Sequence, residues 1–512
     1  VSGEIPDIAP HWVRASDKLR NPALSPTGVR AAFEARGEIL TVPAKKGSAR
    51  IITNTVDAVE RFPAWSPDGQ TLAYFSDAGG NGYHIDLRAQ NGLAAARTLK
   101  LGDDDTYYYS PLWAPDGKSI AYTNSRGEIF FIDVATGKIR KVDTDPQGPQ
   151  GGGGVLTSGM GMSWSPDSKW LAYGRSIRNR LSAVFVYDVA KGVSTQVTDG
   201  MSDARFPAFD PNGKYLYFVA STDAGPASDF SMTTFDHPVT RNLYAIVLRK
   251  DLPSPMAPES DEEKAKTPGA AAGGTTSAAS DSATRAKAAA AVATDVRIDF
   301  DDIDQRTIAL PVPARDYIAV ASLKSGSVIL AEAPLVPVDL QSGPSRYVLY
   351  KYDVGERKTD RIMEDISEFD FSRDGEKLLY RRGSTWTIAP LGPARPGQGA
   401  QAAQSTDTQG PLATADVNVY SDPRAEWKQM YHEAFRFQRA FFYDPSYHGL
   451  DLAATERFYA RYLDGLSTRS DLDYVFQEAF GNLTVGHLFV GPAPPDTAGI
   501  RPPPRAGLLG AD

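Results

Sequence analysis

His487 is the residue of this chain whose setting most suggests chemistry. It is one of six histidines, and it lies in the phrase FGNLTVGHLF at 480–489, directly after Gly486. Imidazole titrates near neutral pH, so it can take a proton from a hydroxyl group or a water molecule. The small residue before it and the apolar run behind it would give a base both reach and support. Taken alone, a histidine in a turn is more often an ordinary polar residue than a catalytic one, and both interpretations stay open at this point.

A general base needs a nucleophile, and the residues do not identify one. No Gly-x-Ser-x-Gly elbow is present, and the nearest phrase, TSGMGMSW at 157–164, lacks that pattern. A catalytic role for His487 therefore depends on a partner that must be found by other means.

The other histidines and two glutamates are interpreted as structural. His432 and His448 do not have the His-x-x-x-His spacing of a metal-binding pair, and the chain has no cysteine. We expect them at the surface or at helix caps, and we expect Glu433 and Glu478 on solvated helix faces. Structural roles are also expected for His11, His84 and His237. The sequence therefore predicts neither a metal site nor a cofactor.

The segment 417–491 is predicted to be a small helical domain that carries His487. Apolar residues recur there with a helical period, and Asp422 with Pro423 suits a helix start. A second helix is expected to begin at Asp451. The third helix is expected to open with Ser470 as N-cap and Asp473 as the N3 partner. It should end at Gly481, before the run HLFV, which is predicted to be a short buried strand.

The first three quarters of the chain repeat one phrase. AWSPDGQTLAYFSD from Ala64 and LWAPDGKSIAYTNS from Leu112 both place a Pro-Asp-Gly turn before an alternating strand. The centres of these turns are Thr27, Asp68, Asp116, Asp167, Asn212 and Asp374. The first five are 41, 48, 51 and 45 residues apart. Repeats of this length, each made of several short strands, predict a mainly β chain with a seven-bladed β-propeller over 21–392.

The seventh blade must come from the long gap between Asn212 and Asp374. The phrase RTIALPVPARDYIAVASLKSGSVILAEA from Arg306 is interpreted as a degenerate blade, with Pro-Ala-Arg where Pro-Asp-Gly would stand. The same gap contains an Ala-, Ser- and Gly-rich insertion near 251–296, which has little to bury and is expected to be disordered. Residues 393–416 read as a linker. Residues 1–20 are expected to be a connector from a preceding segment, and 492–512 a Pro-rich exit.

Charge and composition exclude several classes of partner. The net charge is -9 and the pI is near 5.4, with no basic cluster, which argues against nucleic acid and anionic membranes. No stretch approaches the roughly 18 to 20 apolar residues of a membrane span.

Several phrases together resemble the tricorn protease family. These are FPAWSPDGQTLAYFSD, NPALSPTGVRAAFEARGEILTVPAKKG, DPRAEWKQMYHEAFRFQRAFFYDPSYHGLDL and GNLTVGHLFVG. The resemblance covers almost the whole chain and implies the seven-bladed propeller and helical domain of such an enzyme. It further implies a preceding six-bladed propeller, and a PDZ domain and a Ser-bearing catalytic domain that follow Asp512.

The family resemblance gives His487 the role of general base in a serine-type peptidase. It implies that the nucleophilic Ser lies outside this chain, and that the chain alone is inactive. Many members have a Ser before this histidine, and here Gly486 takes its place. Peptide or unfolded polypeptide substrates, a homo-oligomer and a cytoplasmic location are implied as well, with the periplasm as the alternative compartment.

Two other interpretations remain. The chain could be a non-catalytic propeller adaptor of the TolB kind that binds peptides or proteins. It could also be the propeller of a prolyl-oligopeptidase-type enzyme, but an α/β-hydrolase would then follow the propeller directly, and the helical domain does not fit.

Overall fold

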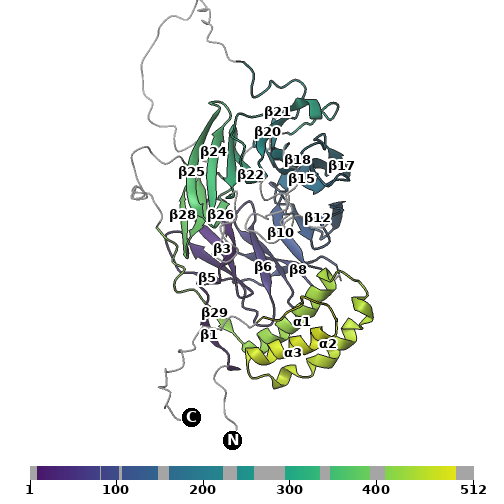
Figure 1. The fold of residues 1–512 in the computed structure, drawn as a ribbon. Coiled ribbons are helices and arrows are strands. Elements are labelled where there is room, and N and C mark those ends of the chain that lie inside the picture. The colour runs from purple at the N-terminus through teal and green to yellow at the C-terminus, as the bar shows by residue number, and fades with distance from the viewer. Residues whose placement is uncertain are drawn as a thin grey trace, which may run out of the picture. The chain divides into compact units, whose positions relative to one another are not determined.

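The computed structural model describes residues 8–80, 82–102, 106–147, 161–222, 239–258, 295–334, 346–392 and 410–491. The chain divides into two compact units. The first comprises Val1–Met160, Pro337–Val348 and Ile362–Asp512, and the second comprises Gly161–Val336 and Leu349–Arg361. The described strands form a seven-bladed β-propeller, and three helices follow it (Figure 1). The predicted fold class is therefore confirmed.

Four blades belong to the first unit. Each is an antiparallel meander, and the strands of each pair with their neighbours in chain order. The strands are β2 (Arg20–Leu24), β3 (Arg30–Ala35), β4 (Glu38–Pro43) and β5 (Arg50–Ile51), then β6 (Glu60–Trp65), β7 (Thr71–Ser76), β8 (His84–Ala89) and β9 (Arg97–Lys100), then β10 (Tyr108–Trp113), β11 (Ser119–Asn124), β12 (Glu128–Asp133) and β13 (Ile139–Thr144), and the three-stranded blade β26 (Glu368–Phe371), β27 (Lys377–Arg382) and β28 (Thr385–Pro390).

Three blades lie mainly in the second unit. Their strands are β14 (Ser163–Trp164), β15 (Trp170–Ser176), β16 (Ser182–Asp188) and β17 (Val193–Gln196), then β18 (Asp203–Phe209), β19 (Tyr215–Ser221), β20 (Asn242–Val247) and β21 (Thr307–Ala309), then β22 (Tyr317–Lys324), β23 (Ser327–Glu332), β24 (Tyr347–Asp353) and β25 (Lys358–Ile366). A short 3-10 helix, Asp304–Arg306, precedes β21.

The predicted limits of the degenerate blade are wrong. Its expected first strand, β21, instead pairs with β20 and completes the preceding blade, with Tyr244 opposite Ala309. Pro-Ala-Arg therefore connects two blades, and the first hairpin turn of the next blade lies at Gly326, which has a φ of +71°. The error arises because β20 and β21 are distant in sequence, so periodicity alone assigned β21 to the nearer strands.

The recurring turn has the chemistry that its sequence predicts. The amide of Gly69 donates to the carbonyl of Ser66 at 2.8 Å, and Gly69 has a φ of +70°, which suits glycine. The Ser66 hydroxyl accepts from the amide of Thr71 at 2.9 Å and donates to the Asp68 carboxylate at 2.5 Å. Each turn therefore fixes the start of the strand that follows it.

In the first unit, the first strand of each blade contacts the first strand of its neighbour. Trp65 donates its indole hydrogen to the carbonyl of Ala23 at 3.0 Å, and Trp113 does the same to Ala64 at 3.2 Å. These bonds join one blade to the next. Three of these first strands, β2, β6 and β10, also carry a bulge with a positive-φ residue before a proline, at Asn21, Phe62 and Ser110.

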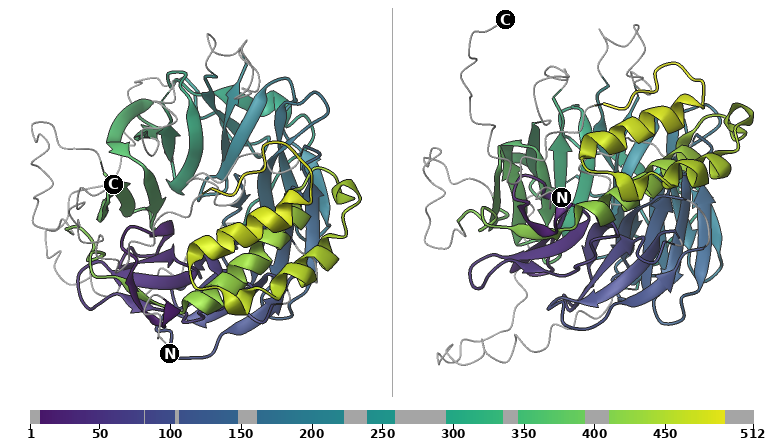
Figure 2. Two further views of the ribbon diagram at one scale, coloured as in Figure 1. Left: turned by 60° about the horizontal axis from the view of Figure 1, so that its bottom comes forward. Right: turned by 90° about the horizontal axis from the view of Figure 1, so that it is seen from below.

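The helical region belongs to the first unit. It consists of α1 (Pro423–Phe441), α2 (Leu452–Ala460) and α3 (Arg469–Gly481), with 3-10 turns at Tyr447–Gly449 and Leu463–Gly465. Figure 2 shows the three helices side by side. The two-stranded sheet of β1 (His11–Arg14) and β29 (Asn418–Ser421) precedes α1. The apolar core of this region is formed by residues such as Tyr431, Phe435, Leu472, Phe476, Ala479 and Leu483.

Two of the predicted helix starts are confirmed and one is wrong. Asp422 accepts from the amides of the first turn of α1, and Asp451 accepts from the amide of Ala454. The third helix, however, begins two residues earlier than expected, with Thr468 as N-cap and Asp471 as its capping-box partner. Thr468 has the same cap chemistry as a serine, so the sequence pattern fits both registers.

Residues 487–490 do not form the predicted buried strand. They have no strand partner, and Phe489 is 81% exposed. Leu488 and Val490 are half-buried and pack against the helical core, whereas His487 and Phe489 are exposed. The segment therefore alternates between buried and exposed side chains as a strand would, although no described strand pairs with it.

Several sequence expectations fall outside the described residues. The insertion near 251–296 is described only at 251–258 and 295–296, and the linker 393–416 only from residue 410. The exit segment 492–512, His237 and residues 157–160 also lie outside, as do the first seven residues of the connector 1–20. The domain boundaries therefore stay predictions. Among the described helices, none has the length and apolar character needed to cross a membrane.

Candidate functional site

Helix α1 meets the blades of the first unit through buried charges. Arg436 is 5% exposed, and it donates to the carboxylates of Asp77 at 2.9 Å and Glu433 at 2.5 Å. Burial alone would lower the pKa of Arg436, but its hydrogen bond to Asp77 and the charge of Glu433 raise that pKa above its usual value. The Arg436 guanidinium is therefore charged at every pH at which the protein folds.

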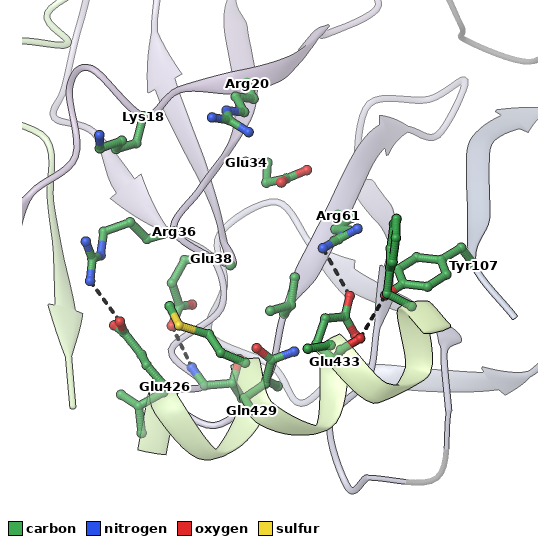
Figure 3. A pocket seen from close by; sticks show the side chains of 18 of the residues that line it. Lys18, Arg20, Glu34, Arg36, Glu38, Arg61, Tyr107, Glu426, Gln429 and Glu433 are labelled. Atoms are coloured by element: carbon green, nitrogen blue, oxygen red, sulfur yellow. Dashed lines mark hydrogen bonds and ion pairs between the residues drawn. The ribbon is translucent and has the colours of Figure 1, made fainter. Parts of the chain in front are cut away.

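Glu433 links α1 to two blades at once. Its carboxylate accepts from Arg61 at 3.1 Å (Figure 3). The same carboxylate accepts from the Tyr83 hydroxyl at 2.8 Å, and the backbone carbonyl of Glu433 accepts from Tyr107 at 3.3 Å. The expectation that Glu433 lies on a solvated helix face is therefore wrong. Two turns of α1 earlier, Glu426 pairs with Arg36 of the first blade at 2.8 Å.

The sequence interpretation missed Asp77, Arg61 and Arg436. One signal was present, because Arg436 lies next to Phe435 on the apolar side of a helix, where a charge must find a partner. A second was the proline two residues after Arg20 and after Arg61, since the bulges at these prolines place the two arginines at equivalent positions of neighbouring blades. Neither signal identifies the carboxylates that form ion pairs with these cations.

A cavity of about 710 Å³ lies between α1 and the first three blades. Figure 3 shows Glu426, Gln429 and Glu433 of α1 on one side of it, and Lys18, Arg20, Arg36 and Arg61 of the propeller on the other. The exposed rings of Phe437 and Phe441, which lie 4.8 Å apart, and the ring of Tyr107 form an aromatic wall. The cavity therefore combines charged and aromatic surfaces.

Two buried glutamates lie at the seam between the first two blades, and one of them, Glu38, lines the cavity. Glu38 accepts from the Thr53 hydroxyl at 2.5 Å and from the amide of Thr55 at 2.9 Å. Glu60 accepts from the Thr55 hydroxyl at 2.5 Å, and its second carboxyl oxygen has no hydrogen-bond partner. Burial and the charge of Glu38 raise the pKa of Glu60 to about 8. Glu60 is therefore largely protonated at neutral pH.

His487 is in a different place of the same unit and does not line this cavity. It is exposed, with a φ of +62°, in the turn after α3. Its ring lies 6.3 Å from that of Phe489, and within the described ranges no hydrogen bond or ion pair reaches its imidazole. The adjacent residues Val485 and Leu488 pack on the helical core and hold the turn.

The other two histidines of the helical region have polar partners. His432 contacts the Glu456 carboxylate at 2.8 Å through Nδ1. His448 contacts the Tyr443 hydroxyl through Nε2 and the carbonyl of Leu483 at 2.8 Å through Nδ1. In the described part of the chain, no three acidic or histidine side chains gather as metal ligands would. Glu478 is exposed on α3, and its side chain makes no hydrogen bond to the described residues.

Comparison with known protein families finds two matches. Residues 19–392 match the tricorn protease second beta propeller domain, and residues 423–481 match the tricorn protease C1 domain. His487 lies six residues beyond the second match.

Among curated proteins, tricorn protease homolog 1 of Streptomyces coelicolor is 25% identical over 99% of this chain and 45% of its own length. The putative tricorn-like protease C-terminal subunit of Sulfurisphaera tokodaii is 25% identical over 76% of this chain and 40% of its own length. The chain thus spans less than half the length of these relatives.

Among solved structures, the tricorn protease has the same fold. It superposes with a TM-score of 0.73 at 18% identity, over 96% of this chain and 43% of that one. Together with the match over 19–392, these findings establish that the chain belongs to the tricorn protease family.

Proposed function

We propose that this chain is the propeller and helical portion of a serine-type peptidase in which His487 is the general base. The nucleophilic Ser would lie outside this chain, and the chain alone would be inactive. In this role the imidazole takes the proton of the attacking Ser hydroxyl and later gives it to the leaving amine of the peptide. Family membership supports the peptidase activity.

The observation that carries the assignment to His487 is its lack of a polar partner. His432 and His448 both have one, whereas the imidazole of His487 is exposed and has none among the described residues. A base must be held on an ordered support and still have a nitrogen available for the reacting group. The packing of Val485 and Leu488 on the helical core supplies that support.

Gly486 leaves room for the hydroxyl that many family members have next to this histidine. A Cβ at Gly486 would meet no atom within 4 Å. A serine would therefore fit there without displacing its neighbours, and its absence does not require a different role for His487.

We propose peptides or unfolded polypeptides as substrates, and the remaining parts of the protease as partners. We also propose a homo-oligomer and a cytoplasmic location, by resemblance to the family, with the periplasm as the alternative location. No cofactor takes part in the proposed acyl transfer, because the protons move between imidazole, hydroxyl and amine.

The test is peptide hydrolysis by the natural full-length protein and its His487→Ala variant. Loss of a triad base lowers kcat by a factor on the order of 10⁴ or more. His432→Ala, which removes a histidine of α1 with an ion-pair partner, is the matched control and should keep its rate. A His487→Ala protein that hydrolyses peptides at the full rate rejects the assignment. A natural protein that binds peptides and never hydrolyses them would instead be a propeller adaptor.

A further inference from the structure

The cavity between α1 and the first three blades has two cationic side chains at one edge that none of its carboxylates binds. Five cationic side chains line it and four carboxylates do so. Three of the cations are paired, since Arg36 binds Glu426, Arg61 binds Glu433, and Arg469 binds Asp473 just outside the lining. The two that remain are Lys18 and Arg20.

The two remaining carboxylates, Glu34 and Glu38, are hydrogen-bonded to groups other than Lys18 and Arg20. Glu34 accepts from the side-chain amide of Asn21 at 2.6 Å. Glu38 lies deeper, and burial raises its pKa, although its bonds to Thr53 and Thr55 act in the opposite direction. No carboxylate of the cavity lining forms a described ion pair with Lys18 or Arg20.

Lys18 and Arg20 remain available to a ligand. Lys18 has 41% of its side chain exposed, and its described ion pair is to the exposed Asp17 at 3.4 Å. No hydrogen bond or ion pair between described residues reaches the side chain of Arg20. Its charge acts on Glu368, which is itself paired with Arg381 at 2.8 Å. Both residues line the cavity, and Figure 3 shows them on its propeller side.

The opposite wall of the cavity is aromatic and incompletely covered. Phe437 and Phe441 of α1 are 52% and 40% exposed, although large apolar side chains are usually buried. The ring of Tyr107 lies 5.4 Å from that of Phe441, tilted by 38°, and continues the same wall. An apolar side chain of a ligand would bury these rings and gain the hydrophobic free energy of that contact.

We propose that this cavity binds a peptide segment that carries a carboxylate together with an aromatic or apolar side chain. Lys18 and Arg20 bind the carboxylate, and Phe437 with Phe441 covers the apolar side chain. The carboxylate is either the C-terminal group of the peptide or an Asp or Glu side chain, because both have the same chemistry. A volume near 710 Å³ is in the range of sites for ligands of this size. The proposal rests on the proposed function only in that the ligand is a peptide.

The test uses this chain itself and measures binding of a fluorescent hexapeptide by anisotropy at low salt. The peptide is labelled at its N-terminus and contains one phenylalanine, one glutamate and a free C-terminus. Three further versions replace the glutamate with glutamine, the terminal carboxylate with an amide, or both. The version without any carboxylate should bind about tenfold more weakly, and the two single replacements show which carboxylate is used.

Two variants locate the site. The double variant Lys18→Gln with Arg20→Gln should remove the difference in affinity between the acidic and the carboxylate-free peptide. The control is the double variant Lys46→Gln with Arg50→Gln, which should preserve that difference. Lys46 and Arg50 are exposed cations of the same blade and do not line the cavity. Phe437→Ala should weaken all four peptides.

The proposal is overturned if none of the peptides binds, if all four bind equally, or if the Lys18 and Arg20 variant keeps the difference. Because this chain is assayed without hydrolysis, a failure here is distinct from a failure of His487 as base.

Discussion

Helix α1 and the turn that carries His487 pack on the same apolar core. They differ in whether their charged or titratable side chains have polar partners. On α1, Arg436, Glu433 and Glu426 are each paired with partners from the propeller. In the turn, His487 is exposed and no described side chain satisfies its nitrogens. Ion pairs therefore attach the helical region to the blades, whereas the imidazole of His487 has no polar partner among the described residues.

The largest effect should come from breaking the buried contact of α1. In Arg436→Ala, Asp77 and Glu433 lose their shared cation while Asp77 stays buried, so the free energy of unfolding should fall by about 3 to 5 kcal/mol. Urea denaturation followed by tryptophan fluorescence measures this loss. Arg457→Ala, an exposed arginine of α2, is the control and should change the free energy by less than about 0.5 kcal/mol. An equal effect of the two variants would contradict the role of the buried pairs.

The next effect concerns the pH dependence of stability at Glu60. Its pKa is raised to about 8 in the folded chain, above the ordinary value of 4.5, so the folded state binds the proton more tightly. Stability from this group is therefore present at low pH and is lost as the pH rises from about 4.5 through about 8, by at most about 1.4 kcal/mol per pH unit. Glu60→Gln should flatten this slope in denaturation measured from pH 5 to 8.

Glu478→Gln, on the exposed face of α3, is the matched control for Glu60→Gln and should leave the slope unchanged. If the Glu60→Gln protein retains the wild-type slope, then Glu60 is ionised in the folded state over this range.

A smaller effect distinguishes the observed start of α3 from the predicted one. Thr468→Ala removes the N-cap hydroxyl that accepts from the amide of Asp471 and should cost about 1 kcal/mol of unfolding free energy. Ser470→Ala should cost less, because Ser470 lies inside the helix. A larger loss for Ser470→Ala would support the register predicted from the sequence.

The smallest effect on stability is expected in the turn itself. His487→Ala removes an exposed side chain that makes no described polar bond, so the free energy of unfolding should change by less than about 0.5 kcal/mol. Thermal or urea denaturation of the isolated chain measures this change. A loss above about 2 kcal/mol would place His487 among structural residues and remove the contrast with α1.

The repeating parts of the fold could be predicted from the sequence, because the same turn residues recur before an alternating strand in successive blades. The Ser66 turn, with its Pro, Asp and Gly, shows how four residues determine a hairpin without distant help. The limits of the degenerate blade could not be predicted, since β20 and β21 pair across a long insertion. Local sequence patterns do not show which distant strands pair.

The candidate site was predictable only in part. His487 could be singled out from the residues around it, but the role of Glu433 could not. A glutamate on a helix appears solvated until the partners that surround it are known, and Arg61 and Tyr83 are hundreds of residues away in sequence. Cavities such as the one beside α1 arise from such distant contacts, so they appear only in the folded chain.

Labelling of the nucleophilic serine tests the central claim most directly. A fluorophosphonate probe reacts with a serine only when a base activates its hydroxyl. We predict that the natural full-length protein is labelled, and that His487→Ala abolishes the labelling while His432→Ala and Arg457→Ala do not. Undiminished labelling of the His487→Ala protein would show that another group activates the serine, and would contradict the proposed role of His487.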